Sequence, residues 1–206
     1  MEEIAPGVLH WTAFHEGIGA TVHSYYVRPA EALLDPMLPE GGVEALEGES
    51  PKRILLTNRH HYRHSDRFRE AFDCPVLCHE AGLHEFEGGP EVDGFAFGDE
   101  VAPGIFAREV GILCPEETAL HVTSGTPQGG TGEGAMAFAD AVVNYGELRF
   151  VSDELLGDNP EQIRTGLKKA LRALAEEHDF EALLLAHGDP IATGGRQALR
   201  DFAAKG

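Results

Sequence analysis

The chain has 206 residues, of which 42% are hydrophobic and 25% are charged, as in ordinary globular proteins that bury a sizeable core. Its 35 acidic residues against 16 basic ones give a formal net charge of −19. A surface of that sign repels phosphate backbones and anionic lipids, which excludes nucleic acids and membranes from the expected partners. We therefore expect a single domain over residues 1–206, with a small molecule as its substrate or ligand.

The three cysteines and the N-terminal residues bear on the cellular compartment. Cys74, Cys78 and Cys114 do not form the pattern of a disulfide framework, and the first two are expected to be small buried residues near a strand. No apolar run approaches the roughly 20 residues that span a bilayer. The first residues also lack the basic and apolar regions of a signal peptide. These features predict a cytoplasmic protein.

The first half of the chain predicts strands around one βαβ unit. Residues 8–11 and 21–27 are rich in β-branched and aromatic residues and are separated by a glycine-containing turn. The segment 37–52 is rich in Pro, Gly and Glu, and leaves room for one helical turn at 43–46. Further elements are expected as a short strand at 31–36, a buried strand at 53–57, a helix at 66–72 and a second buried strand at 75–78.

The second half predicts more short strands and two helices. Apolar residues recur at helical spacing over 160–178, where Asn159 is the expected N-cap and Pro160 the first helical residue. The expected strands are 105–107, 120–123, 135–138, 141–143, 148–151 and 182–186, and a terminal helix is expected at 197–204. This order predicts an α/β (α+β) fold in which two mixed β-sheets pack together, with helices on their outer faces.

Three histidines follow the predicted buried strand at 53–57. His60, His61 and His64 lie within five residues, in the kind of strand-end loop where α/β folds place their sites. If the chain turns into a helix there, His60 and His64 face the same way and can chelate one cation. Asp66 is close enough to join or orient them. The alternative is a solvated polar loop in which the histidines have no common role.

Two later polar residues also follow predicted strands. Asp153 comes after the strand at 148–151, and His187 comes after the strand at 182–186. Alone, the first would be read as a turn or helix cap and the second as a structural histidine. Together with the histidine cluster they form the constellation of a metal-dependent hydrolytic site.

These segments resemble the metallo-β-lactamase superfamily. Residues 54–57 and the histidines after them are similar to the family segment "LLTHxHxDH", and residues 150–153 to the "FxGD" strand with its bridging aspartate. Residues 185–190 resemble the closing "PGHGPP", and 122–127 occupy the place of the "HTPGHTPG" loop. The early strands at 23–27 and 33–35 also agree in order and spacing. The resemblance implies an αββα sandwich, metallo-β-lactamase-like, with hydrolase chemistry.

The metal-binding signature of that family is incomplete here. Two alignments are open, and neither restores the full set. Aligning on Thr57 gives Asn58, His60, Tyr62 and Arg63 at the family's first histidine, second histidine, aspartate and last histidine. Sliding by one residue matches His61 and His64, and leaves Arg59 and Arg63 at the first histidine and the aspartate. In the middle loop, Thr126 replaces the expected metal histidine, and His121 on a strand is a poor substitute.

Residue by residue, the resemblance implies a reduced metal site. It keeps His60 or His61, His64, Asp153 and His187, which would hold at most one divalent cation, expected to be zinc, iron or manganese. A nearby carboxylate, Asp66 or Asp189, would move the proton. The substrate of such a hydrolase-like protein is not specified by the resemblance.

Two other interpretations stay open. In one, the fold is kept but no metal is bound, and the pocket holds a small molecule through Arg59 and Arg63, with Tyr62 beside them. A guanidinium at a ligand position supplies positive charge and repels a cation. In the other, the protein is a structural or oligomerisation partner, for which a homodimer is the expected state.

Overall fold

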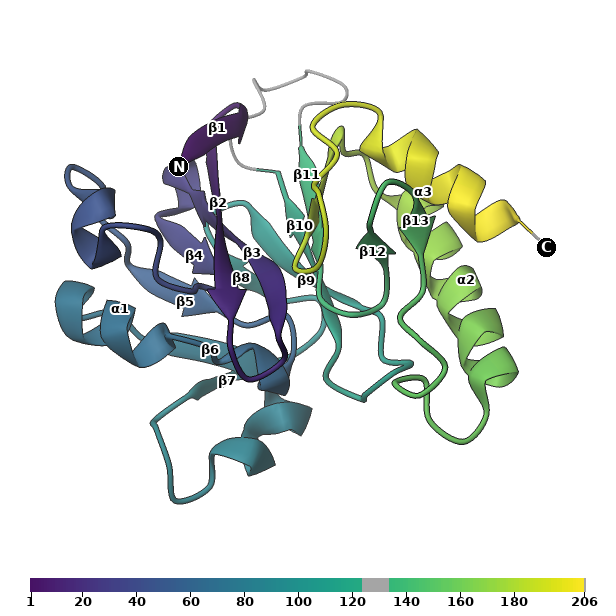
Figure 1. Cartoon of the computed structure of the whole chain (residues 1–206), viewed down its shortest axis with the longest axis horizontal. Coiled ribbons are helices and arrows are strands. Elements are labelled where there is room, and N and C mark those ends of the chain that lie inside the picture. Colours follow the sequence, from purple (N-terminus) through teal and green to yellow (C-terminus); the bar gives the residue numbers. More distant parts are fainter. Residues whose placement is uncertain (124–133, 206) are drawn as a thin grey trace.

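The computed structural model describes residues 1–123 and 134–205, and in it two large β-sheets pack face to face (Figure 1). Helix α1 covers the outer face of one sheet, and α2 and α3 cover the outer face of the other. The predicted αββα sandwich of two mixed β-sheets flanked by helices is confirmed. No helix in the described part of the chain is long and apolar enough to cross a membrane.

The first sheet has seven strands in the order β1-β2-β3-β4-β5-β6-β7. Pairing is antiparallel from β1 to β4 and parallel from β4 to β7. The strands are β1 (Glu2–Ala5), β2 (Val8–His15), β3 (Ala20–Val27), β4 (Ala32–Leu34), β5 (Arg53–Leu55), β6 (Val76–His79) and β7 (Asp93–Phe95).

The second sheet has five strands in the order β14-β11-β10-β9-β8, and a separate two-stranded sheet pairs β12 with β13. Among the strands that the structure describes in this sheet, β11 and β14 are parallel neighbours and the other pairs are antiparallel. The strands are β8 (Glu100–Ala102), β9 (Ile105–Glu109), β10 (Thr118–Val122), β11 (Ala135–Phe138), β12 (Val143–Asn144), β13 (Leu148–Arg149) and β14 (Ala182–Leu185).

The helices follow the sequence pattern closely. They are α1 (Ser65–Phe72), α2 (Pro160–Glu177) and α3 (Gly195–Ala204), and the helical turn expected at 43–46 is a 3₁₀ turn, Gly42–Leu46. Asn159 is the N-cap residue of α2 and Pro160 its first residue, as predicted, although the Asn159 side chain makes no capping hydrogen bond. Residues Glu80–Phe86 form another 3₁₀ segment.

The core lies in three layers because each sheet is apolar on both faces. Between the sheets, alternate residues of both meet, among them Leu55, Ile105 and Leu184. The helical spacing of Leu167 and Leu171 buries α2 against the outer face of the second sheet. A third layer packs beneath α1 and includes Trp11, Ile54, Leu56, Phe68, Val76 and Cys78.

One hydroxyl joins the two sheets at the edge strand β14. Tyr25 on β3 donates its O–H to the Leu185 carbonyl oxygen at 2.7 Å and accepts from the Leu185 N–H at 2.9 Å. The backbone N–H of His23 donates to the Ala186 carbonyl oxygen at 3.0 Å. The middle of β3 is therefore fixed against the end of β14.

Candidate metal centre

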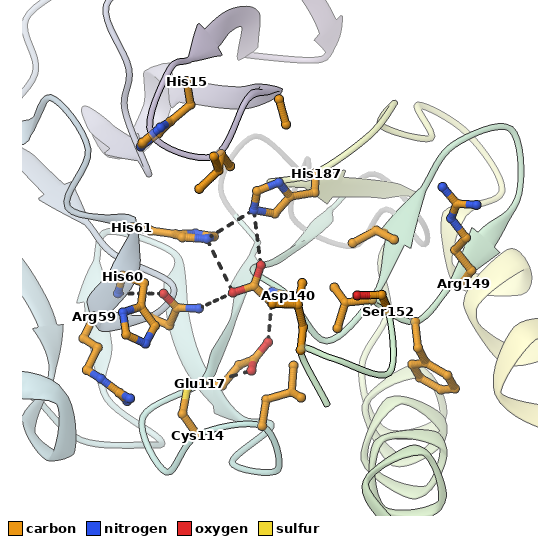
Figure 2. Close-up of a pocket in the computed structure, with 18 of the residues that line it drawn as sticks. His15, Arg59, His60, His61, Cys114, Glu117, Asp140, Arg149, Ser152 and His187 are labelled. Atoms are coloured by element: carbon orange, nitrogen blue, oxygen red, sulfur yellow. Dashed lines mark hydrogen bonds and ion pairs between the residues drawn. The ribbon is translucent and has the colours of Figure 1, made fainter. Parts of the chain in front are cut away.

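Three side chains from distant segments converge between the sheets: His61, Asp140 and His187 (Figure 2). The two Nε2 atoms of the histidines lie 3.4 Å apart. The Asp140 carboxylate lies 3.6 Å from His61 Nε2 and 3.2 Å from His187 Nε2. The first distance joins His61 to Asp140 Oδ2 and the second joins His187 to Asp140 Oδ1. Ligand atoms about 2.1 Å from a tetrahedral ion stand about 3.4 Å apart, so the three side chains are close enough to hold one metal ion.

The turn after β5 explains how His61 reaches the cluster. Asn58 has extended backbone angles, and its Oδ1 accepts from the His60 N–H at 2.9 Å, which starts the 3₁₀ turn Arg59–His61. The same Asn58 side chain donates through Nδ2 to Asp140 Oδ2 at 2.8 Å. The amide that caps the turn thus also orients the carboxylate, and His61 is the histidine of this loop that faces inward.

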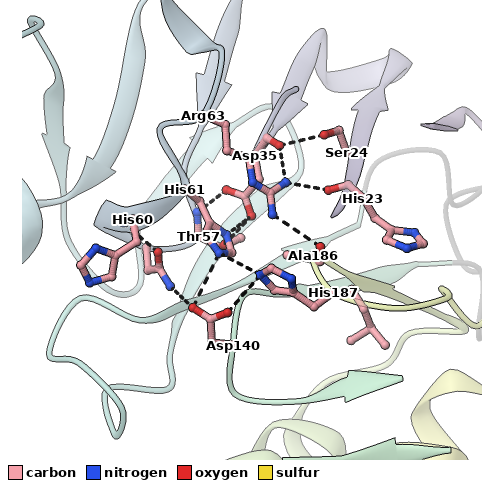
Figure 3. Close-up of polar contacts among 12 residues, drawn as sticks. His23, Ser24, Asp35, Thr57, His60, His61, Arg63, Asp140, Ala186 and His187 are labelled. Carbon is pink, nitrogen blue, oxygen red and sulfur yellow. Dashed lines mark hydrogen bonds and ion pairs between the residues drawn. The ribbon is translucent and has the colours of Figure 1, made fainter. Parts of the chain in front are cut away.

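The other face of the His61 ring is held by a buried carboxylate (Figure 3). Asp35 Oδ2 lies 2.9 Å from His61 Nδ1, and Asp35 Oδ1 accepts from the Thr57 N–H at 2.8 Å. A histidine held in this way carries its proton on Nδ1 and presents the Nε2 lone pair to a metal. Burial opposes the charged form of His61, but Asp35 and Asp140 outweigh it and raise its pKa to about 9, so a cation would bind by displacing the proton from Nε2.

Parallel pairing brings Asp140 and His187 together. Phe138 on β11 and Leu185 on β14 are partners in register, and each metal-site residue lies two positions beyond its partnered residue. The chain then turns away at Gly188, whose φ is +81° and where a Cβ would lie 1.9 Å from the Asn144 carbonyl oxygen. Only glycine fits at this position, because the backbones of residues 144 and 188 pass so close to each other.

A second carboxyl group, Glu117, lies beneath Asp140. It is fully buried, lines the same cavity and accepts from the Asp140 N–H at 3.0 Å. Burial raises the pKa of Glu117, and the Asp140 carboxylate raises it further, to about 8. Burial also opposes ionisation of Asp140, but His61 and His187 outweigh it and hold the Asp140 pKa well below its usual range. The two carboxyl groups are therefore in different protonation states near neutral pH.

Arg63 has a structural place beside the cluster. Its guanidinium donates to the carbonyl oxygens of His23 at 2.8 Å, Asp35 at 2.7 Å and Ala186 at 3.4 Å (Figure 3). Its backbone φ of +48° is in the left-handed region, which is unusual for a residue other than glycine. Burial lowers the pKa of Arg63. The side chain crosslinks β3 to the residues that follow β4 and β14 rather than pointing a free charge at a ligand.

The structure does not bring His64 or Asp153 to the cluster, which corrects the ligand set expected from the sequence. His64 is the residue before α1, and its Nδ1 accepts from the Leu38 N–H at 3.1 Å. Asp153 is exposed and pairs with Arg164 of α2. The aspartate of the cluster is instead Asp140, which lies two residues beyond Phe138 at the end of β11.

The two carboxylates expected to move a proton also lie elsewhere. Asp66 is exposed in the first turn of α1. Asp189 is exposed, and its backbone is hydrogen bonded to Asn144. Neither lines the cavity beside the cluster, and Glu117 is the carboxyl group found there besides Asp140 among the described residues.

The remaining predicted site residues lie beside the cluster or away from it. His60 is exposed and lines the cavity but is not among the three clustered groups. Arg59 also lines it, with its guanidinium paired to the buried Glu116. Tyr62 packs against Phe86 under the first sheet and does not line the cavity. Thr126 lies outside the described residues, and His121 on β10 is bonded to the Asp179 carbonyl oxygen instead.

A cavity of about 900 Å³ opens beside the cluster. His61, Asp140 and His187 lie on its wall, together with Asn58 and Glu117. The sequence analysis missed Asp35, Glu117 and Asp140. Asp140 alone carried a usable signal, because it follows the predicted strand at 135–138 just as His187 follows the strand at 182–186.

Comparison with solved structures identifies the fold. A metallo-β-lactamase family protein from Thermus thermophilus is similar over 98% of this chain and 80% of its own, with a TM-score of 0.69 and 19% identity. BJP-1, a subclass B3 metallo-β-lactamase of Bradyrhizobium japonicum, matches 98% of this chain and 88% of its own, with a TM-score of 0.65 and 12% identity. This chain has the metallo-β-lactamase fold.

A third solved structure with the metallo-β-lactamase-like arrangement is TTHA1623 in a di-iron-bound form. It matches 93% of this chain and 99% of its own, with a TM-score of 0.66 and 21% identity. No protein-family model matches the sequence. No curated protein matches it either. The resemblance drawn from the sequence motifs is thus confirmed for the fold, and the chemistry of the site has to be argued from its own residues.

Proposed function

We propose that this chain is a hydrolase that holds one divalent cation between His61, Asp140 and His187. The observation that carries the proposal is the close approach of two imidazoles and one carboxylate. The two Nε2 atoms lie 3.4 Å apart, Asp140 Oδ1 lies 3.2 Å from His187 Nε2, and Asp140 Oδ2 lies 3.6 Å from His61 Nε2. Separations of this size suit a single ion held by all three side chains. The Asp35 carboxylate behind His61 adds the orienting contact that metal-bound histidines usually have.

Two imidazoles and one carboxylate suit zinc, iron or manganese. A bound cation of this kind polarises a scissile bond and lowers the pKa of water. Catalytic zinc sites commonly have three protein ligands, which is the number gathered here. This reading corresponds to a reduced site, because Asn58, Arg63 and His64 offer no further ligand to the cluster.

The other residues of the site have separate tasks in this proposal. Asp35 fixes the His61 ring, and Asn58 fixes the Asp140 carboxylate by donating to its Oδ2. Glu117 lies on the cavity wall and can exchange a proton with a substrate through the oxygen that does not accept from Asp140 N–H. It takes the role that the sequence analysis gave to Asp66 or Asp189.

The metal-free alternative with an arginine pocket is less well supported. Arg63 is bonded to three backbone carbonyl groups, and Arg59 is paired with Glu116. A ligand anion would have to replace these partners. The hydrolase proposal requires no such rearrangement.

The experiment is metal analysis of the purified protein, before and after incubation with zinc, by inductively coupled plasma mass spectrometry. We expect close to one metal ion per chain, lost in Asp140→Asn and His187→Ala. Asp153→Asn and His64→Gln are matched controls, since both residues were candidates in the sequence and lie outside the cluster. Esterase, lactonase and phosphodiesterase assays then follow on the loaded protein. Wild-type metal content in both cluster variants would rule the proposal out.

A further inference from the structure

The cavity beside the cluster has two chemically different sides. The turn after β5 supplies the polar side, which includes Asn58, Arg59 and His61. The opposite side is largely apolar and comes from residues 143–155 together with Leu113. Figure 2 shows Arg149 and Ser152 on that side, across the cavity from His61. A ligand that reaches the cluster therefore contacts apolar surface on its other side.

Exposed apolar side chains gather at this cavity. Ile18, Tyr145 and Leu155 are 57%, 51% and 70% exposed, and all three line it. They are three of the five large hydrophobic residues that are exposed in the described part of the chain. A contiguous exposed apolar patch is typical of a ligand-binding groove, whereas single exposed hydrophobic residues are ordinary.

The apolar side rests on the core beneath it. The rings of Phe150 and Phe202 lie with centroids 4.8 Å apart, and Phe202 belongs to α3. Leu113, Phe150 and Val151 all pack against the buried cluster beneath α2 and α3. The apolar wall is thus a supported surface that is preformed for a hydrocarbon segment.

Arg149 supplies a cation at the same wall. Its guanidinium lies 4.7 Å from the centre of the Tyr145 ring, and it has no carboxylate partner among the described residues. That is notable in a chain with 35 acidic and 16 basic residues, where carboxylates are abundant. Stacking on the ring holds the guanidinium in place and leaves its N–H groups available to an anion.

We propose that the cavity binds an anionic amphiphile: an acyl ester or thioester whose hydrocarbon segment lies on the wall of Leu113, Phe150 and Leu155, and whose negatively charged end meets Arg149. The assignment as substrate rests on the hydrolase function proposed above. Water would add across the C–O or C–S bond, giving a carboxylic acid and an alcohol or thiol. The few hydrogen-bonding groups on the wall disfavour a polar nucleotide or sugar in the same place.

The test separates ligand recognition from catalysis by measuring the binding of inert probes with isothermal titration calorimetry at low ionic strength. 1-Octanesulfonate carries both features, 1-octanol has only the chain, and methanesulfonate has only the charge. Sulfonates coordinate metals weakly, so the measurement does not depend on a cation at the cluster. We expect octanesulfonate to bind at least about fivefold more tightly than octanol, and methanesulfonate to bind least.

Three variants locate the contacts. Arg149→Gln is expected to weaken octanesulfonate about fivefold and to leave octanol unchanged, because only the charged contact is lost. Leu155→Ser is expected to weaken both octyl compounds. Arg67→Gln is the matched control, since it removes an exposed arginine from α1, remote from the cavity, and is expected to change neither.

Several results would overturn the inference. If octanol binds as tightly as octanesulfonate, or if Arg149→Gln leaves both affinities unchanged, then Arg149 does not recognise the negatively charged end of a ligand. No binding of either octyl compound, with a dimer in light scattering that dissociates in Leu155→Ser, would show that a second copy covers the wall. Probe binding that follows the expected pattern in a protein that holds no metal and hydrolyses no ester would support this inference and refute the hydrolase proposal.

Discussion

Replacing Asp35 by Asn tests whether this buried carboxylate, which is not itself one of the metal-site residues, raises the metal affinity of His61. Asp35 accepts from the Thr57 N–H at 2.8 Å and lies 2.9 Å from His61 Nδ1, and its side chain is almost fully buried. An asparagine has the same shape and can keep the Thr57 contact through its oxygen. Its NH₂ group then faces His61 Nδ1 and donates to it.

That donation changes the tautomer of His61. With Nδ1 accepting, the imidazole proton moves to Nε2, which is the atom that faces Asp140 and His187. A protonated Nε2 cannot bind a metal, so the ring must flip or ionise at a cost. Removing an orienting carboxylate typically weakens metal affinity about 10- to 100-fold, which is about 1.4 to 2.7 kcal/mol. We expect a loss within that range for Asp35→Asn.

The assay is competition for zinc with a chromophoric chelator, with Asp153→Asn as a control that removes one exposed carboxylate of the same type. Thermal unfolding of both apoproteins, followed by circular dichroism, shows whether the variant is folded at the assay temperature. A folded Asp35→Asn protein with wild-type zinc affinity would refute the tautomer argument. In that case the contact between Asp35 and His61 would serve stability alone.

Three further outcomes are expected. Arg63→Met leaves the carbonyl groups of His23, Asp35 and Ala186 without their donor and should lower the free energy of unfolding by about 3 kcal/mol or more in urea titration. A loss below about 1 kcal/mol would contradict the crosslinking role. Glu117→Gln keeps the acceptor for the Asp140 N–H, so metal content should stay while hydrolysis falls about 100-fold, and full activity would exclude Glu117 from proton transfer. Burial lowers the pKa of His23 to about 4, and its Nδ1 lies 2.9 Å from His10 Nε2. Between pH 6.5 and 4, His23 therefore binds a proton in the unfolded chain but stays neutral in the folded protein. The free energy of unfolding should fall by up to about 3 kcal/mol as the pH is lowered over this range. In His23→Asn that part of the slope should vanish, and an unchanged slope measured by denaturant titration would refute it.

The sequence was sufficient for the fold because its signals are local. Period-2 and period-3.6 patterns predicted nearly every large element, including the strand at 135–138 and the helix at 160–178, which is observed as Pro160–Glu177. The strands β1, β7 and β8 were missed because they are short and are not built from a run of apolar residues.

The site was predicted only in part because its geometry depends on register and on buried partners. The choice between His60 and His61 is made by the Asn58 cap and by Asp35, which is 26 residues away from His61 in the chain. Asp140 and Asp153 both follow apolar stretches, and only the parallel pairing of β11 with β14 distinguishes them. No sequence pattern states which strands become neighbours.

The Tyr25 hydroxyl has a consequence for self-association. A strand at the edge of a sheet presents unpaired N–H and C=O groups that another chain can extend into a continuous sheet. On β14 the hydroxyl occupies both backbone groups of Leu185, and Ile191 pairs with Leu183 further along the same strand. Growth of the sheet from this edge would first have to break the contacts that hold the two halves of the sandwich together, so native packing itself protects the strand from polymerisation.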